Sequence, residues 1–300
     1  MLIALVLVTL NETVLVFRPS SQAFQDASEG LAAALEDEFQ FEEYLVVRGE
    51  TTQTDLAQKI EATHPHLIVL MGIDAIDFYT KYQKSKAEGT VFPPGLILMS
   101  LNAEKQGEKL KNMAVITYEI PGVNSLSQMR TLLEIPIHKV GVLYSPALEG
   151  FFKAQRELCI EEKIDLVGIS IKPMPKKKLK AKHIKEGLRV LVQDLEVDAV
   201  WVLNDTNLLG MRRGEADPKI IRKGWMRSLE KNKIPVLVSV RSLMDLGHLG
   251  IFPDHYRMGE QAATLIYRIR ESDWKWEKDV VQYPISTVSV LNRTLVKAHQ

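Results

Sequence analysis

The sequence has little cysteine, no excess charge of either sign and no apolar run long enough to span a membrane. Its single cysteine, Cys159, excludes an intramolecular disulfide framework and a cysteine-based zinc site. Lysine plus arginine number 38, as do aspartate plus glutamate, so a general nucleic-acid or membrane-surface binder is disfavoured. The 300 residues, 46% of them hydrophobic, are enough for two lobes that each bury a core.

Common catalytic and nucleotide-binding motifs are also missing. We find no Walker loop, Gly-x-Gly-x-x-Gly turn, Gly-x-Ser-x-Gly elbow or His-Glu-x-x-His helix. His64 and His66 flank a proline before a predicted strand, which favours a surface turn over a metal site. Cys159 shares a helical face with Phe152 and Gln155, which predicts a buried core thiol. We therefore expect a protein that is not an enzyme and has neither a cofactor nor a metal.

Residues 1–10 form an apolar run that is shorter than the roughly 20 residues of a membrane-spanning helix. The run resembles the apolar core of a signal peptide, although no basic residues precede it and no small-x-small cleavage site follows it. The alternative is a buried parallel strand rich in Val, Leu and Ile. We favour a remnant of an export signal at residues 1–11, which predicts a periplasmic or other extracytoplasmic location.

Short β-rich runs alternate with amphipathic helical stretches along the chain. The predicted strands are 13–18, 41–47, 66–71, 95–101, 114–120, 139–145, 165–171, 199–204, 235–240, 249–252 and 282–291. Thr52 and Asp55 form a possible capping box that opens one of the helices between them. Strands separated by helices predict an α/β protein with two Rossmann-like lobes, each built on a parallel sheet with helices on both faces.

The chain is expected to cross between the lobes three times, near residues 118–122, 250–254 and 271–274. The N-terminal lobe then comprises residues 12–120 and 253–273. The C-terminal lobe comprises residues 121–252 and 274–292, and residues 293–300 form a tail. Lobes joined by several hinge strands tend to bend about them and bind a ligand in the cleft between them.

Polar residues and one glycine follow the predicted strands, and open parallel sheets bind ligands outside the carboxyl ends of their strands. The candidate ligand-binding residues are Ser20, Ser21, Gly72, Ser100, Asn102, Tyr144, Ser145, Asp205 and Arg241. They suit a small polar or zwitterionic ligand, with Asp205 as the anchor of an ammonium group. Each can instead be a plain helix cap, and Asp205 can cap the segment that contains Thr206 and Asn207.

The stretch from Lys172 to Lys185 holds seven lysines and no acidic residue. A solvated loop leading into a helix is the favoured interpretation. The alternative is a basic rim of the ligand cleft, which would attract an anionic ligand or an acidic partner surface.

Several segments carry a family resemblance. They are Lys139-Val-Gly-Val-Leu-Tyr-Ser-Pro, Asp198-Ala-Val-Trp-Val-Leu-Asn-Asp-Thr-Asn, Ile234-Pro-Val-Leu-Val-Ser, Leu246-Gly-His-Leu-Gly-Ile and Tyr256-Arg-Met-Gly-Glu-Gln-Ala-Ala. In this order they resemble motifs of the ABC transporter substrate-binding proteins related to tryptophan/tyrosine binders. The resemblance spans about residues 13–295 and is specific over residues 140–263. It implies a type I periplasmic-binding-protein fold, a ligand between the lobes, an ABC permease as partner and a monomeric state.

Departures from the family concern the ligand more than the fold. The family usually has Thr after its third strand, where this chain has Met71-Gly72, and its Asn after the Tyr is Ser145 here. The Asp that can engage the ligand's amino group in such proteins is retained as Asp205. An aromatic amino acid is therefore only one candidate ligand.

Three functional classes are compared. The leading one is a solute-binding protein of an ABC importer, which presents a small molecule to a permease. The alternative is a ligand-sensing protein of the same fold coupled to a signalling partner, since fold does not determine function. No helix-turn-helix segment precedes residue 13, which counts against a DNA-binding repressor, and the missing phosphate-binding glycines count against an enzyme.

Overall fold

The computed structural model describes residues 12–172, 180–211, 216–276 and 280–299. Within these residues the chain forms two compact units. Unit 1 contains residues 12–119 and 253–286, and unit 2 contains residues 120–252 and 287–299. Residues 1–11, the subject of the export prediction, and residues 173–179 of the lysine-rich run lie outside the described residues.

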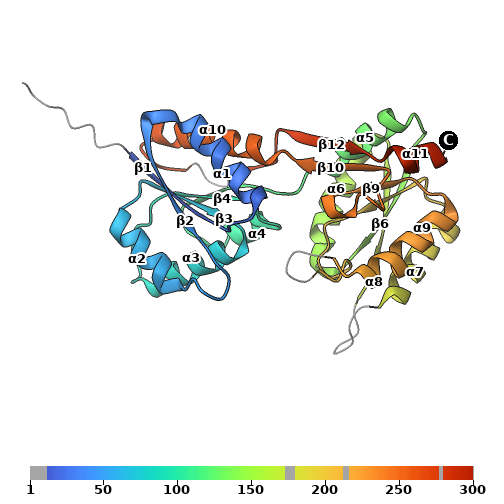
Figure 1. The fold of residues 1–300 in the computed structure, drawn as a ribbon, viewed down its shortest axis with the longest axis horizontal. Coiled ribbons are helices and arrows are strands. Elements are labelled where there is room, and N and C mark those ends of the chain that lie inside the picture. The colour runs from blue at the N-terminus through green and yellow to red at the C-terminus, as the bar shows by residue number, and fades with distance from the viewer. Residues whose placement is uncertain (1–11, 173–179, 212–215, 277–279, 300) are drawn as a thin grey trace, which may run out of the picture. The chain divides into compact units, whose positions relative to one another are not determined.

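Unit 1 is built on a six-stranded sheet in the order β11-β5-β4-β3-β1-β2 (Figure 1). The strands are β1 (Glu12–Arg18), β2 (Phe39–Leu45), β3 (Leu67–Met71), β4 (Gly95–Leu98), β5 (Met113–Ile116) and β11 (Val281–Gln282). All neighbouring strands are parallel. β3 is fully buried, as expected for an apolar strand covered on both faces.

The first four helices of unit 1 each follow one of its strands, and the fifth comes from a much later segment of the chain. They are α1 (Gln22–Leu35), α2 (Gln53–Thr63), α3 (Ile73–Ser85), α4 (Ala103–Gly107) and α10 (His255–Glu271). The predicted capping box is confirmed at the start of α2, where Asp55 N–H donates to Thr52 Oγ1 at 3.3 Å and Thr52 N–H donates to Asp55 Oδ2 at 2.7 Å. α1 and α10 lie side by side although more than 200 residues separate them (Figure 1).

Unit 2 repeats this plan with the strand order β12-β10-β9-β8-β6-β7. Its strands are β6 (Lys139–Tyr144), β7 (Asp165–Ser170), β8 (Ala199–Val202), β9 (Val236–Val238), β10 (Leu249–Pro253) and β12 (Thr287–Leu291). Its helices are α5 (Gly122–Leu133), α6 (Glu149–Glu161), α7 (Ala181–Arg189), α8 (Pro218–Ile220), α9 (Arg227–Asn232) and α11 (Arg293–His299). β7, β6, β8, β9 and β10 are parallel to one another.

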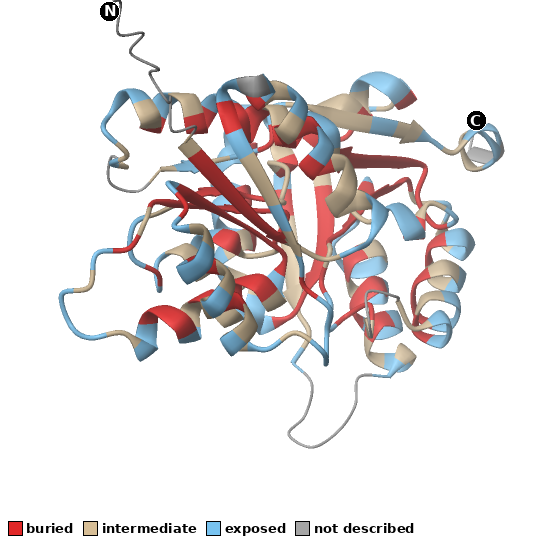
Figure 2. Ribbon diagram, turned by 60° about the vertical axis from the view of Figure 1, so that its left-hand side comes forward, coloured by how far each residue is buried: buried red, intermediate tan, exposed pale blue. Residues whose placement is uncertain are grey.

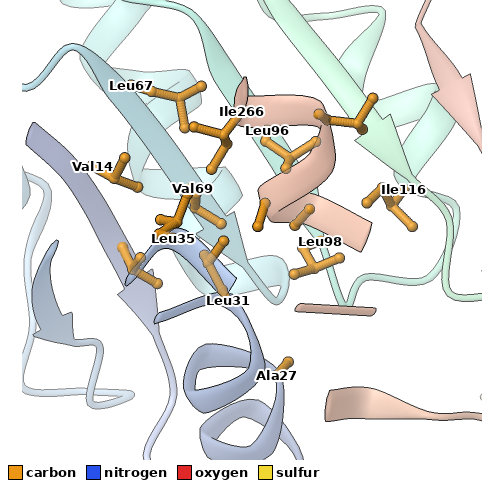
Figure 3. Close-up of a cluster of buried hydrophobic side chains, with 14 of the residues drawn as sticks. Val14, Ala27, Leu31, Leu35, Leu67, Val69, Leu96, Leu98, Ile116 and Ile266 are labelled. Atoms are coloured by element: carbon orange, nitrogen blue, oxygen red, sulfur yellow. The ribbon is translucent and has the colours of Figure 1, made fainter. Parts of the chain in front are cut away.

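Each unit has its own apolar core on both faces of its sheet. In unit 1, the face under α1 and α10 is packed with Val14, Leu31, Val69 and Ile266, all with no exposed surface (Figure 3). In the ribbon coloured by burial, the strands are mostly buried and the helices expose their outer faces (Figure 2). The two-lobed α/β architecture predicted from the sequence is thus confirmed.

The predicted third crossing is wrong. Residues 274–276 and 280–286 belong to unit 1, and the chain passes to unit 2 between Ser286 and Thr287 instead of at 271–274. The single strand predicted at 282–291 is in fact two strands, β11 in one sheet and β12 in the other. Pro284 stands between them and has no N–H to donate to a sheet. The assumed tail contains α11, whose Val296 packs against the core of unit 2.

Candidate functional site

The strand order reverses next to β1 in unit 1 and next to β6 in unit 2, and ligands of open α/β sheets bind at such switch points. In unit 1, Ser20 and Ser21 follow β1 and are exposed. Ser21 is the N-cap residue of α1, but its hydroxyl makes no capping hydrogen bond. Both side chains are thus open to solvent, and the hydroxyl of Ser21 is not used to cap α1.

Gly72 follows β3 at the same switch point. Its φ of +79° lies in the region that favours glycine, and a Cβ there would approach the Phe24 ring to 3.2 Å. Its N–H donates to Leu98 O at 3.3 Å. Gly72 thus lets the chain turn closely against the first turn of α1, which positions the segment next to Ser20 and Ser21.

The carboxyl ends of β4 and β5 are held together by a carboxylate. Asn102 N–H donates to Glu119 Oε1 at 2.7 Å, and the Ser100 hydroxyl donates to Gln106 Oε1 at 2.9 Å. Burial raises the pKa of Glu119 above its ordinary value, despite the opposing hydrogen bond from Asn102. Sequence reasoning missed Glu119 because it placed this residue inside a strand over 114–120, whereas β5 ends at Ile116.

At the switch point of unit 2, the structure brings Ser145 and Asp205 together. Ser145 follows β6, and its N–H donates to Asp205 Oδ2 at 2.6 Å. Both residues are buried, with exposed fractions of 1% and 3%. The Ser145 hydroxyl accepts a hydrogen bond from Asn207 Nδ2 at 3.2 Å.

The Asp205 carboxylate also caps the segment that follows it. Oδ1 accepts from the N–H groups of Asn207 at 2.9 Å and Leu208 at 3.1 Å. With the bond from Ser145, three backbone donors use three of about four acceptor positions of the carboxylate. This geometry supports the capping role that the sequence left open, and the role of Asp205 as ligand anchor stays a prediction.

Tyr144 and Arg241 differ in their surroundings. Tyr144 is buried and its ring stacks on Phe152, with centroids 4.6 Å apart. Burial raises the pKa of its phenol, which stays neutral at physiological pH. Arg241 is exposed after β9, with its guanidinium 6.0 Å from the centroid of the Phe252 ring.

Two polar atoms at strand ends of unit 2 are buried and have no hydrogen-bond partner among the described residues. They are Ser170 Oγ, at the end of β7, and Asn204 Oδ1, shortly after β8. Ser170 pairs in register with Tyr144. Buried polar groups are normally satisfied, so these two atoms offer unused hydrogen-bonding capacity at the carboxyl edge. The predicted strand 165–171 enclosed Ser170, which is why Ser170 was not selected from the sequence.

Cys159 and His66, the side chains considered for reactive or metal chemistry, are buried or hydrogen-bonded within the fold. Cys159 is fully buried, and burial raises the pKa of its thiol to about 11. His66 Nδ1 accepts a hydrogen bond from Thr13 N–H at 3.1 Å. Within the described ranges, no three His, Cys, Asp or Glu residues are arranged to hold a metal ion. In the same ranges, no helix has both the length and the apolar character needed to cross a membrane.

Comparison with known proteins gives structural matches only. No family model matches the sequence, and neither does any curated protein. An open, ligand-free substrate-binding protein with adhesive properties from Clostridium difficile is 14% identical, over 96% of this chain and 94% of that one, with a TM-score of 0.66. The ABC domain in complex with L-Trp from Streptococcus pneumonia is also 14% identical, with the same coverage and a TM-score of 0.55.

A third match is the periplasmic ribose ABC transporter from Conexibacter woesei, at 12% identity, 96% and 94% coverage and a TM-score of 0.54. At such low identity these matches report on the fold. Together with the two parallel sheets of the same plan, they show that the chain has the type I periplasmic-binding-protein fold.

Proposed function

We propose that this protein is an exported solute-binding protein of an ABC importer, which binds a small polar or amino-acid-like molecule without changing it chemically. The observation that carries the proposal is the set of polar groups at the carboxyl edge of each sheet, above all Asn204 Oδ1 and Ser170 Oγ, which have no hydrogen-bond partner among the residues that the structure describes. The protein acts as a monomer that delivers its ligand to a permease.

The chemistry of the two edges favours a small polar ligand. Ser20 and Ser21 offer exposed hydroxyls, and Asn204 offers a carbonyl oxygen. Arg241 adds one exposed cation after β9, which can pair with a carboxylate. The ligand-binding residues predicted from the sequence are retained in this proposal as contacts, with Asp205 and Gly72 also shaping the loops that present them.

Native mass spectrometry of the purified protein tests the proposal directly, because a solute-binding protein can retain its ligand. We expect an adduct of a few hundred daltons that is lost on unfolding. A thermal-shift panel of the twenty amino acids and common monosaccharides then identifies the chemical class of the ligand. The absence of a bound ligand in both experiments would contradict the proposal.

A matched pair of variants locates the site. Asn204→Ala should weaken binding of the identified ligand about tenfold, the value of one hydrogen bond of about 1.4 kcal/mol. Asn124→Ala, at an exposed position of α5, should leave affinity unchanged. Equal affinities of the two variants would remove Asn204 from the site.

A sensing protein of the same fold would bind the same class of ligand and differ only in its partner. Affinity purification of the tagged protein from its native cells distinguishes the two. Recovery of a permease and its ATPase supports the importer, and recovery of a kinase or cyclase supports the sensor.

A further inference from the structure

Unit 2 contains a cavity of about 230 Å³ at the amino-terminal edge of its sheet. Val236, which lines it, is the first residue of β9, and His248, also in its wall, directly precedes β10. The candidate ligand-binding residues follow the opposite, carboxyl ends of these strands. The cavity is therefore separate from the solute site proposed above.

The floor of the cavity is apolar and fixed. Leu229, Val236 and Leu246 are buried. His248 Nδ1 accepts a hydrogen bond from Val236 N–H at 3.2 Å, and His248 N–H donates to Val236 O at 2.8 Å. This pairing holds the imidazole against the first residue of β9 and fixes that part of the wall.

The mouth of the cavity carries two acidic side chains and one basic side chain. Glu230, Lys233 and Asp245 line the cavity and are exposed, which places them where it opens to solvent. Two carboxylates and one ammonium group give these three side chains a net negative charge, which favours a cation over an anion.

The C-terminal helix closes one side. Leu295 of α11 lines the cavity, and Asn292 fixes the start of that helix. Asn292 N–H donates to His248 O at 2.9 Å, Asn292 Nδ2 donates to Met244 O at 2.9 Å, and Asn292 Oδ1 accepts from Leu295 N–H at 3.3 Å. These bonds seat Leu295 beside the loop that carries His248.

We propose that this cavity is a second ligand site, which takes a small arylalkylamine with its ring on the apolar floor and its ammonium group at the acidic mouth. An engineered apolar cavity of about 150 Å³ accommodates benzene, so the present volume suffices for one ring and a short side chain. Apolar walls with a few polar groups at the opening are the usual composition of small-molecule sites.

Two probes of similar shape and opposite charge test the proposal. 2-Phenylethylamine and 3-phenylpropionate are titrated by saturation-transfer NMR at low ionic strength. We expect saturable binding of the amine, at least tenfold tighter than that of the carboxylate. The preference should shrink in the double variant E230Q/D245N. Absence of saturable amine binding, or equal binding of the two probes, overturns the proposal.

Variants that fill the cavity locate the bound probe. Met226→Trp and Leu295→Trp start from half-buried positions in its wall and should each abolish amine binding while the thermal melt remains cooperative. Two tryptophan variants are used so that the test still stands if one of them fails to fold. Arg241→Ala, at the carboxyl edge, should leave amine binding unchanged. Amine binding that persists in both folded tryptophan variants, or is lost in Arg241→Ala, places the probe elsewhere and refutes the site independently of the solute-binding function.

Discussion

Asp205 shows how one side chain can serve the loops at a switch point. Its carboxylate joins the end of β6 to the segment after β8 through the N–H groups of Ser145, Asn207 and Leu208. Truncation to Ala leaves three donors without this acceptor, at least one of them buried. We expect Asp205→Ala to lower the free energy of unfolding by about 2–4 kcal/mol, measured by urea denaturation.

Asp217 provides the matched control, because it accepts from the N–H groups of Lys219 and Ile220 as an ordinary N-cap. Asp217→Ala should cost about 1 kcal/mol. Calorimetric titration of Asp205→Asn with the identified ligand tests the anchor role separately. Lost affinity in a protein that is still folded supports the anchor, and unchanged affinity in a destabilised protein leaves Asp205 as a cap only.

Glu119 makes stability depend on pH in a definite direction. Its pKa is raised in the folded state, so the folded protein binds this proton more tightly than the unfolded chain does. The contribution of Glu119 to the free energy of unfolding is then greatest in acid and falls as the pH rises through the raised pKa. Glu119→Gln keeps an acceptor for Asn102 N–H and removes the charge. We expect the variant to gain stability relative to the wild type between acidic and neutral pH in urea titrations, and a constant difference would show that burial does not control this carboxyl.

At the scale of elements, the crossing of α1 and α10 depends on two glycines. A Cβ on Gly30 would overlap the carbonyl oxygen of Tyr256, and a Cβ on Gly259 would overlap that of Ala27. Ala is otherwise the better helix former by about 1 kcal/mol, so any loss measures the crossing itself. We expect Gly30→Ala and Gly259→Ala each to lower the free energy of unfolding by about 1–3 kcal/mol. Increased stability in either variant would contradict this, because it would mean that α1 and α10 move apart without a loss of free energy of unfolding.

Local sequence signals predicted most helices and strands, but not the features that depend on contacts between residues far apart in the sequence. The apolar run of β3 and the capping box of α2 needed only neighbouring residues. The third crossing depended on Gln261 of α10, whose Nε2 donates to Gln282 Oε1 and Tyr283 O, each at 3.0 Å, and whose Oε1 accepts from Ile285 N–H at 3.2 Å. No pattern in the neighbouring sequence predicts these hydrogen bonds of Gln261 to residues 282–285. The same limit applies to the site, where Ser145 was identified by its position after a strand but its bond to Asp205 spans 60 residues.

At the scale of the whole molecule, each apolar cluster lies within one unit. The clusters around Leu31 and Leu56 belong to unit 1, and those around Leu126 and Leu188 belong to unit 2. Units with separate cores need not unfold in one cooperative step. The four tryptophans divide equally, with Trp274 and Trp276 in unit 1 and Trp201 and Trp225 in unit 2. Fluorescence can therefore follow one unit at a time.

This division gives a test of which residues hold the solute. In the double variant W274F/W276F the remaining tryptophan fluorescence reports the unfolding of unit 2. Adding Leu31→Ala removes a fully buried side chain and destabilises unit 1 by about 2–5 kcal/mol. If the solute of the proposed function contacts Ser20 and Ser21 as well as Asn204, its binding free energy stabilises both units, by about 2.7 kcal/mol in total at a hundredfold excess over Kd. We then expect the ligand to raise the urea midpoint of unit 2 by a smaller amount in the protein that carries Leu31→Ala than in the protein without this substitution. The reason is that part of the binding free energy offsets the weakened unit 1. An equal rise in both backgrounds would assign the ligand to unit 2 alone and remove the two serines from the site.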